Sequence, residues 1–173
     1  MMEKWDILNA DGTLTGRTTQ RGRCNLKPNE YHLVVHIWVV SSRGDILVQR
    51  RSENKKLMPG EWAATGGAAI SGEDSYTAAN RELYEELGIP SNKNTLKKLA
   101  RIKRRNSLLD VWFINTDVDS AKLRLQSDEV AEAKWISRAE FETMIKNGEF
   151  HNYGKEYFDT VFEKIDEQLG VMA

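Results

Sequence analysis

Apolar residues between positions 31 and 51 form two short runs that predict a pair of strands. The first run, "YHLVVHIWVV" (31–40), is rich in β-branched and aromatic residues, which favour a buried strand. A turn sequence, "SRGD" (42–45), separates it from the second run, "ILVQRR" (46–51), so we expect a hairpin. Residues 5–27 begin with a short apolar stretch and continue with Gly, Thr and Arg, which predicts an irregular or hairpin-like lead-in.

A helix is predicted from Asp74 to about Leu87. Asp74 is a favourable N-cap residue, and Gly88 and Pro90 would end the helix. The small residues that precede it, "ATGGAAI" (64–70), are compatible with a short strand. A strand, a loop and a helix are therefore expected in succession in the middle of the chain.

The second half of the chain alternates between strand and helix patterns. Three further strands are predicted, at 96–105, 108–116 and 131–137. Ser137 and Glu140 form a capping-box pattern that opens a helix, and residues 154–169 have the periodicity of a final amphipathic helix. Because strands and helices interleave irregularly, we expect an α/β fold with an α/β/α layered arrangement around a mixed sheet.

Length and charge narrow the class of protein. The chain has 173 residues, so we expect a single domain over 1–173 with residues 1–29 as an N-terminal lead-in. With 40% hydrophobic and 29% charged residues, it can bury a core and remain soluble. The formal net charge of -1 shows no basic excess, so we expect no DNA partner.

Cysteine content and apolar run lengths indicate the compartment. Cys24 is the only cysteine, so it cannot form an intrachain disulfide or a thiolate metal site alone. The first residues lack a basic stretch followed by an apolar run, and the apolar run 33–40 is too short to cross a bilayer. We therefore expect a cytoplasmic protein with no membrane partner.

The predicted central helix carries an unusual group of carboxylates. At 100° per residue, Glu82, Glu85 and Glu86 span an arc of roughly 100° on one face. Like charges at this spacing destabilise a helix by a few tenths of a kcal/mol, and no lysine four residues away compensates them. A solvated acidic face and a site for Mg²⁺ or Mn²⁺, which prefer oxygen ligands, both remain open from helix geometry alone.

The spacing of residues 67–89 resembles the signature of the Nudix hydrolase superfamily at every defined position. The sequence runs Gly67, five residues, Glu73, seven residues, Arg81-Glu82-Leu83, one residue, Glu85-Glu86, one residue, Gly88-Ile89. So many defined positions make the match specific. The flanking stretches "WDILNADGTLTGR", "ILVQRRSENKKLMPGEW" and "EAKWIS" also resemble a Nudix subgroup similar to isopentenyl-diphosphate isomerase.

The resemblance implies a fold, an activity and a metal. Nudix proteins have an α/β/α sandwich and typically hydrolyse a nucleoside diphosphate linked to another group, with Mg²⁺ or Mn²⁺. By similarity, Glu82, Glu85 and Glu86 would bind the metal, and Glu73 would hold the loop to the helix through a salt bridge with Arg81. The implied partner is a small-molecule diphosphate, and a homodimer is a further possibility.

The same resemblance gives structural roles to two glycines and leaves the general base open. Gly67 would permit close backbone approach at the strand end, and Gly88 would cap the helix. The base varies in this superfamily. Glu85 is the first candidate, and Glu129 or Glu132 is an alternative, although loop acids such as these two more often simply face solvent.

Candidates for substrate contact lie mainly outside the motif. Arg50 and Arg51, followed by Lys55 and Lys56, could meet phosphates or could form an exposed strand end. Trp62 could stack on a base, but an aromatic residue in a strand is more often part of the core. The run from Lys93 to Arg105 contains seven cations and no acid; a solvated strand face and an anion or RNA site are both open.

Two other functions compete with hydrolysis. Isopentenyl-diphosphate isomerisation needs a catalytic cysteine and histidine ligands near residues 61–70, and "EWAATGGAAI" has neither, although His32 matches one histidine position. Isomerisation is therefore disfavoured. A non-catalytic Nudix module that binds a nucleotide or RNA usually lacks a motif carboxylate, whereas this chain keeps them all, so hydrolysis is favoured.

Overall fold

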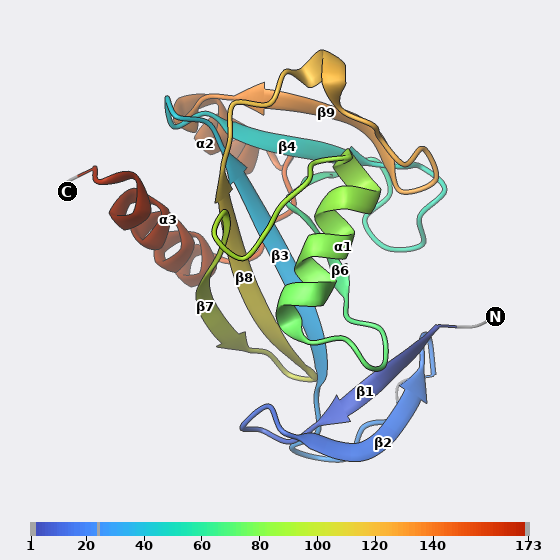
Figure 1. Cartoon of the computed structure of the whole chain (residues 1–173). Helices are drawn as coiled ribbons and strands as arrows, with labels where there is room; N and C mark the ends of the chain where they lie inside the picture. Colours follow the sequence, from blue (N-terminus) through green and yellow to red (C-terminus); the bar gives the residue numbers. More distant parts are fainter. Residues whose placement is uncertain (1–2, 24, 172–173) are drawn as a thin grey trace.

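The computed structural model describes residues 3–23 and 25–171. Cys24 lies outside the described residues, so its lack of a disulfide or metal role stays a prediction. The elements run, in order, β1 (Lys4–Leu8), β2 (Leu14–Gln20), β3 (His32–Val40), β4 (Ile46–Arg51), β5 (Trp62–Ala63), β6 (Thr65–Ala68), α1 (Ser75–Leu87), β7 (Leu96–Lys103), β8 (Ser107–Asn115), a 3-10 turn (Ser120–Lys122), β9 (Val130–Ile136), α2 (Arg138–Asn147) and α3 (Lys155–Leu169) (Figure 1).

Strand β3 is the centre of a mixed sheet. It pairs in parallel with β8 along its length, and β7 continues the sheet in antiparallel pairing with β8. On its other side β3 pairs with β4 only at Val39 and Val40, and with β6 at positions 34–37. The predicted hairpin is thus confirmed only at its turn. Strand β4 then diverges to pair with β5 and β9, which opens a split between β4 and β6.

Helices cover both faces of this sheet, as Figure 1 shows. Side chains of β3 alternate between the faces. Val35 packs in the cluster that contains Leu83 of α1, whereas Trp38 packs in the opposite cluster with Phe141 of α2 and Val161 of α3. Each face of β3 is therefore apolar, as expected for a central strand. The predicted α/β/α sandwich is confirmed. In the described part of the chain, no helix is both long and apolar enough to cross a membrane.

Helix α1 begins and ends where the local sequence predicts. The Asp74 carboxylate accepts a hydrogen bond from the Thr77 backbone N–H, and Gly88 ends the helix with φ +70°. An N-cap of this kind stabilises a helix by about 1 kcal/mol. In α2 the Ser137 hydroxyl accepts from the Glu140 N–H, while the Glu140 carboxylate accepts from Lys134, so the helix-start half of the predicted capping box forms.

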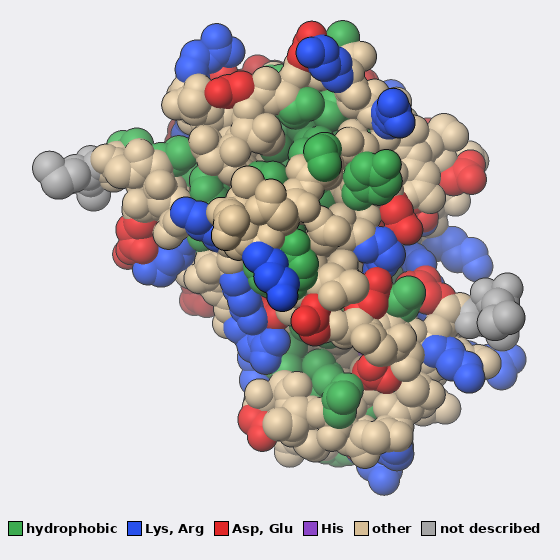
Figure 2. Space-filling model, in the orientation of Figure 1, with side chains coloured by type: hydrophobic (Ala, Val, Ile, Leu, Met, Phe, Trp, Pro, Cys, Tyr) green, Lys and Arg blue, Asp and Glu red, His purple; other side chains and the backbone are tan. Residues whose placement is uncertain are grey.

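The N-terminal lead-in is an antiparallel pair, β1–β2, that packs beside the start of α1. Asp6 accepts hydrogen bonds from the Ser71 hydroxyl (2.6 Å) and the Gly72 N–H (2.8 Å), in the loop between β6 and α1. A cleft of about 550 Å³ separates this hairpin from α1 and β8. Figure 2 shows apolar side chains in this hollow, and acidic and basic side chains interspersed over the surrounding face.

Candidate functional site

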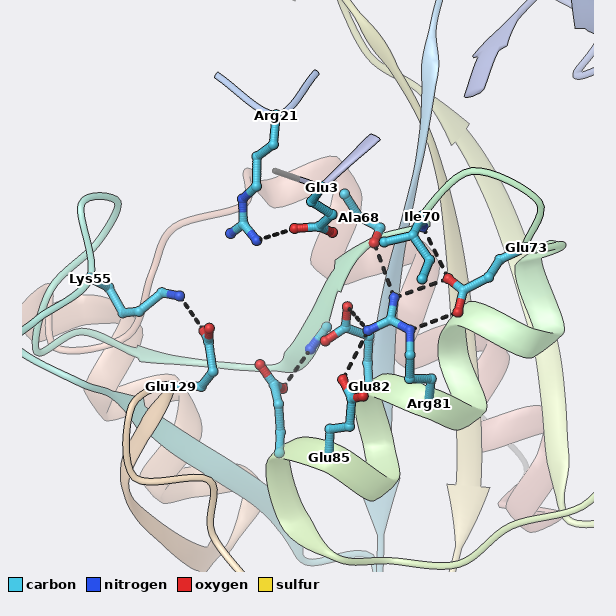
Figure 3. Close-up of polar contacts among 12 residues, drawn as sticks. Glu3, Arg21, Lys55, Ala68, Ile70, Glu73, Arg81, Glu82, Glu85 and Glu129 are labelled. Atoms are coloured by element: carbon cyan, nitrogen blue, oxygen red, sulfur yellow. Dashed lines mark hydrogen bonds and ion pairs between the residues drawn. The ribbon is translucent and has the colours of Figure 1, made fainter. Parts of the chain in front are cut away.

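Arg81 organises the acidic face of α1. Its Nε and Nη2 donate to the two oxygens of Glu73 at 2.7 and 3.0 Å, which fastens the β6–α1 loop to the helix. Its Nη1 donates to Glu82 Oε1 (2.9 Å) and Glu85 Oε2 (3.0 Å) (Figure 3). The hydrogen bond with Glu73 is the main cause of a raised Arg81 pKa, so the guanidinium remains charged. One cation thus holds three carboxylates in fixed positions.

Glu86 is buried at the split between β4 and β6. Its side chain has only 2% of its surface exposed, and its Oε2 accepts from Gln49 Nε2 (2.9 Å) on β4 and from the Gly66 N–H (3.1 Å) on β6. Burial, followed by the nearby charge of Glu82, raises the pKa of Glu86 to about 8. The strands therefore diverge around a carboxylate whose negative charge has little compensation within the protein.

Glu82 lies against the backbone of β6. Burial raises its pKa above the ordinary value, although Arg81 opposes the shift. A Cβ atom at Gly67 would stand 2.4 Å from Glu82 Oε1, so only glycine leaves room for this carboxylate. The close approach that the motif implies for Gly67 thus occurs, and the atom approached is a carboxylate oxygen.

The three helix carboxylates are chemically suited to a hard divalent cation, but they do not form a finished coordination shell. No group of three His, Cys, Asp or Glu side chains within the described residues is spaced to hold a metal ion. The reason is visible in the contacts, because Arg81 holds Glu82 and Glu85 while Glu86 is turned toward Gln49.

Free acceptor atoms nevertheless remain beside these contacts. In the described structure, one oxygen each of Glu82, Glu85 and Glu86 takes part in the hydrogen bonds above, and the other has none. Gln49 Oε1 is also buried without a hydrogen-bond partner. Oxygen donors of this kind are the ligands that Mg²⁺ and Mn²⁺ prefer, so the chemistry of the donor set suits such an ion.

Some of the predicted substrate and base residues lie near this face. Arg51 is close enough to Glu86 to lower the pKa of that carboxyl, against the larger effect of burial, and it lies two positions from Gln49 along β4. Glu129, in the loop before β9, is close enough to Glu82 to add to the rise in its pKa. Glu129 forms an ion pair with Lys55, so the loops on either side of the acidic face meet there (Figure 3).

Other predicted residues are not brought to the acidic face. Arg50 and Glu132 are directly paired on β4 and β9, with their charged groups 3.4 Å apart. Trp62 packs with the α2–α3 cluster, and Lys134 lies 4.8 Å from the centre of its ring. These side chains therefore belong to the sheet face opposite α1.

Part of the basic run 93–105 has an internal partner. Lys98 and Arg101 donate to Asp110 at 2.7 and 2.6 Å, and the Asp110 side chain has 0% of its surface exposed. The expectation of a purely solvated strand face is therefore incomplete, because these two cations neutralise a buried carboxylate. A single acid within the apolar stretch "LLDVWF" was the available signal.

Sequence reasoning also missed two contributors to the site. Gln49 lies within an apolar strand pattern, and nothing local links it to Glu86, which is far along the chain. Arg21 follows β2 and pairs with Glu3, yet it is close enough to Glu82 to be influenced by its charge. Only the folded arrangement reveals these contacts.

Comparison with known proteins agrees with this geometry. Residues 30–158 match the NUDIX domain family. The uncharacterized Nudix hydrolase lmo0368 of Listeria monocytogenes is 39% identical over 153 residues, which cover 88% of this chain and 90% of that protein. Nudix hydrolase 3 of Arabidopsis thaliana is 30% identical over 157 residues, covering 83% of this chain but 20% of the plant protein.

Solved structures show the same fold. The crystal structure of DR0079 from Deinococcus radiodurans superposes with a TM-score of 0.74 at 23% identity, covering 91% of this chain and 97% of that chain. The NUDIX domain of Shewanella oneidensis NrtR, solved with ADP ribose, gives a TM-score of 0.59 at 16% identity, covering 79% of this chain and 87% of that one. The isomerase-like subgroup stays a prediction. The chain belongs to the Nudix hydrolase family.

Proposed function

We propose that this chain hydrolyses a diphosphate linkage in a small molecule, a nucleoside diphosphate derivative, with Mg²⁺ or Mn²⁺ as cofactor. Family membership supports pyrophosphate hydrolysis as the reaction. The observation that carries the proposal to this site is the pair of carboxylates Glu82, which is largely buried, and Glu86, which is buried; burial is the main cause of the raised pKa of each. Buried like charges are costly unless a cation neutralises them.

The chain supplies a set of oriented oxygen atoms to that cation. Glu82, Glu85 and Glu86 would hold it through the oxygens that other contacts leave free. A divalent cation bound there neutralises phosphate charge and lowers the pKa of a bound water. Arg81 fixes Glu82 and Glu85, and Gln49 fixes Glu86, so three carboxylates are oriented before a ligand binds.

Glu85 is our candidate for the general base that takes the proton of the attacking water. Its side chain is 48% exposed, the largest exposure among the three helix carboxylates, so water reaches it directly. Glu129 is the second candidate, and its ion pair with Lys55 would have to open first. Glu132 remains a weaker prediction, because it pairs with Arg50 on the face of the sheet away from α1.

The negative charge of the substrate also needs compensation from the protein. Arg51 is the phosphate-binding residue that we favour, because its charge already acts on Glu86. For Arg50 and Trp62 substrate contact stays a prediction from the sequence. A homodimer, a cytoplasmic location and the assignment of residues 1–173 to one Nudix domain likewise stay predictions.

A non-catalytic nucleotide-binding module is the second candidate function. One structural neighbour, the NUDIX domain of NrtR, is described as a complex with ADP ribose, and its similarity of 16% identity supports the fold alone. Binding without turnover would make the carboxylates of α1 a ligand site only. The two functions differ in whether product forms.

Phosphate release from a panel of diphosphate compounds tests the proposal. The panel contains nucleoside di- and triphosphates, sugar nucleotides, ADP-ribose and prenyl diphosphates, each with Mg²⁺ or Mn²⁺. A coupled phosphatase releases inorganic phosphate from phosphomonoester products, so that these products are also detected. We expect one class to be hydrolysed by the wild type and not by Glu85→Gln. The matched control is Glu163→Gln, an exposed acid on α3. Ligand-induced stabilisation without any product would favour the binding module.

A further inference from the structure

The N-terminal hairpin brings a cation to the acidic face of α1. Arg21 lies directly after β2, and its Nη1 is 2.6 Å from Glu3 Oε2. The hydrogen bond that Arg21 donates to Glu3 is the main cause of the raised Arg21 pKa, and the charges of Glu129 and Glu82 add to the rise. In Figure 3, Arg21 and Glu3 face the side of α1 that carries Glu82 and Glu85.

Backbone contacts hold this part of the hairpin without help from the Arg21 side chain. The Arg21 N–H donates to the Glu3 carbonyl at 3.0 Å, and the Ser71 N–H donates to the Lys4 carbonyl at 2.8 Å. Asp6 binds the Ser71 hydroxyl as well, at 2.6 Å. The guanidinium is therefore free to change partners while the hairpin remains fixed to the loop that precedes α1.

The ion pair between Arg21 and Glu3 is of the kind that exchanges readily. The two side chains are 56% and 27% exposed, and ion pairs at such positions contribute little to stability. A phosphate group offers a guanidinium several charged acceptor oxygens in a geometry that permits two parallel hydrogen bonds. A phosphate bound at the acidic face of α1 within reach of Arg21 can therefore replace the Glu3 carboxylate at small cost.

Neither residue belongs to the matched domain. The NUDIX match begins at residue 30, after the hairpin and after Arg21. Arg21 therefore belongs to the segment that precedes the matched domain. A residue outside the motif that reaches the acidic face is well placed to select among substrates, because it leaves the reacting groups unchanged.

We propose that Arg21 is a substrate-binding residue that contacts a phosphate of the diphosphate substrate, and that Glu3 is the carboxylate which this phosphate displaces. The inference rests on the proposed function of the same site. It identifies the substrate class as one whose phosphate groups extend from the carboxylates of α1 toward the hairpin. Glu3 then acts as an internal competitor that weakens binding of every such compound.

Calorimetric titration with methylenediphosphonate, a diphosphate analogue that is not hydrolysed, tests this on the full chain in the presence of Mg²⁺. We expect Arg21→Gln to weaken binding about tenfold, and Arg21→Lys to restore part of the loss. Glu3→Gln should tighten binding by about two- to fivefold because Arg21 loses its competitor. The matched control is Arg17→Gln, which removes a cation of the same hairpin that pairs with Glu30.

The double variant separates the proposed role from a structural one. If Glu3 acts only through Arg21, then Glu3→Gln combined with Arg21→Gln should bind the analogue as Arg21→Gln does, within about twofold. A purely structural role for Arg21 would lower the melting temperature of the free protein and leave the dissociation constant unchanged.

The outcomes that overturn the inference are specific. Equal affinities for Arg21→Gln and Arg17→Gln would remove Arg21 from the site, and so would absence of binding by the wild type at millimolar analogue. Failure of this inference can be distinguished from failure of the proposed hydrolysis, because the titration measures binding and needs no turnover. Binding that depends on Arg21, together with a phosphate-release panel that yields no product, would keep this inference and reject hydrolysis.

Discussion

Gln49 donates from its Nε2 to Glu86 Oε2 over 2.9 Å, and this bond joins β4 to α1 across the split in the sheet. Glu86 is nearly inaccessible, so it depends on such donors for the hydrogen bonds that water would otherwise supply. The pairing explains why a polar residue stands in an otherwise apolar strand. It also makes the position of Glu86 sensitive to a residue outside the Nudix motif.

Replacement Gln49→Leu should destabilise the protein by about 1–3 kcal/mol, because it leaves a buried carboxylate without one of its donors. Urea denaturation in the absence of metal measures the loss. Gln168→Leu on the surface of α3 is the control and should change stability by less than about 0.5 kcal/mol. Equal stabilities for the two variants would show that the Gln49–Glu86 bond is dispensable.

Divalent metal should stabilise the folded protein, because a ligand that binds only the native state raises its melting temperature. We expect 10 mM Mg²⁺ or 1 mM Mn²⁺ to raise the melting temperature of the wild type by a few degrees. This rise corresponds to an increase in the free energy of unfolding on the order of 1–2 kcal/mol. Glu86→Gln should lose most of this rise.

Glu163→Gln should keep the metal-induced rise, since this acid lies on α3, in the layer on the other face of the sheet. A rise of the same size in Glu86→Gln would assign the metal effect to other groups. Differential scanning fluorimetry at several metal concentrations is sufficient for this comparison.

A side chain at position 67 should disturb the acidic face more than the fold. In Gly67→Ala the new Cβ would meet Glu82 Oε1 at 2.4 Å, so the carboxylate must move away from its position beside Arg81. We expect turnover to fall at least about tenfold, equivalent to about 1.4 kcal/mol in the transition state, while circular dichroism keeps its native form.

The control for that experiment is Gly148→Ala, at the end of α2. Nothing lies within 4 Å of a Cβ there, and φ of +73° makes the substitution a pure test of backbone strain. Gly148→Ala should lose stability and keep turnover. Full turnover by Gly67→Ala would mean that Glu82 need not occupy its observed position.

The buried Asp110 predicts a stability that depends on pH. Burial alone would raise the pKa of Asp110, but hydrogen bonds from Arg101 and Lys98 outweigh it and hold the pKa below its ordinary value. A depressed folded pKa adds stability that is fully present above the unfolded pKa, near 3.8, and is lost as pH falls through the folded value.

Asp110→Asn should therefore cost about 3 kcal/mol at pH 7, because two cations lose their buried partner. The difference in free energy of unfolding between variant and wild type should narrow below about pH 3.8, where Asp110 becomes protonated in the unfolded wild type but stays charged in the folded one. Urea titrations at pH 7 and pH 3 measure this difference in free energy of unfolding. The control is Asp159→Asn, at an exposed position of α3. A gap that stays constant with pH would contradict the assignment.

Local sequence signals were sufficient where short-range chemistry decides the structure. Asp74 and Gly88 set the limits of α1, and the helical spacing of Glu82, Glu85 and Glu86 predicted a common acidic face. Helix periodicity places residues three and four apart on one side whatever the rest of the chain does. The resemblance to the Nudix signature implied the Glu73–Arg81 salt bridge, and the structure contains it.

Long-range contacts could not be obtained in this way. The split between β4 and β6, into which Glu86 inserts, depends on which strands pair with β3 and for how many residues. Arg50 and Arg51 were given equal weight by the sequence, although neighbouring residues of a strand point to opposite faces. Because β9 and β5 pair with β4, Arg50 meets Glu132 and Trp62 on the face away from α1.

The most direct test of the central proposal is hydrolysis in water enriched with ¹⁸O, analysed by mass spectrometry for the best compound of the panel. We predict one ¹⁸O atom in a phosphoryl product, formed only with Mg²⁺ or Mn²⁺ and absent with Glu86→Gln. Such a result would establish metal-dependent attack of water on phosphorus at the acidic face of α1. Product without ¹⁸O in its phosphate, or undiminished turnover by Glu86→Gln, would contradict it.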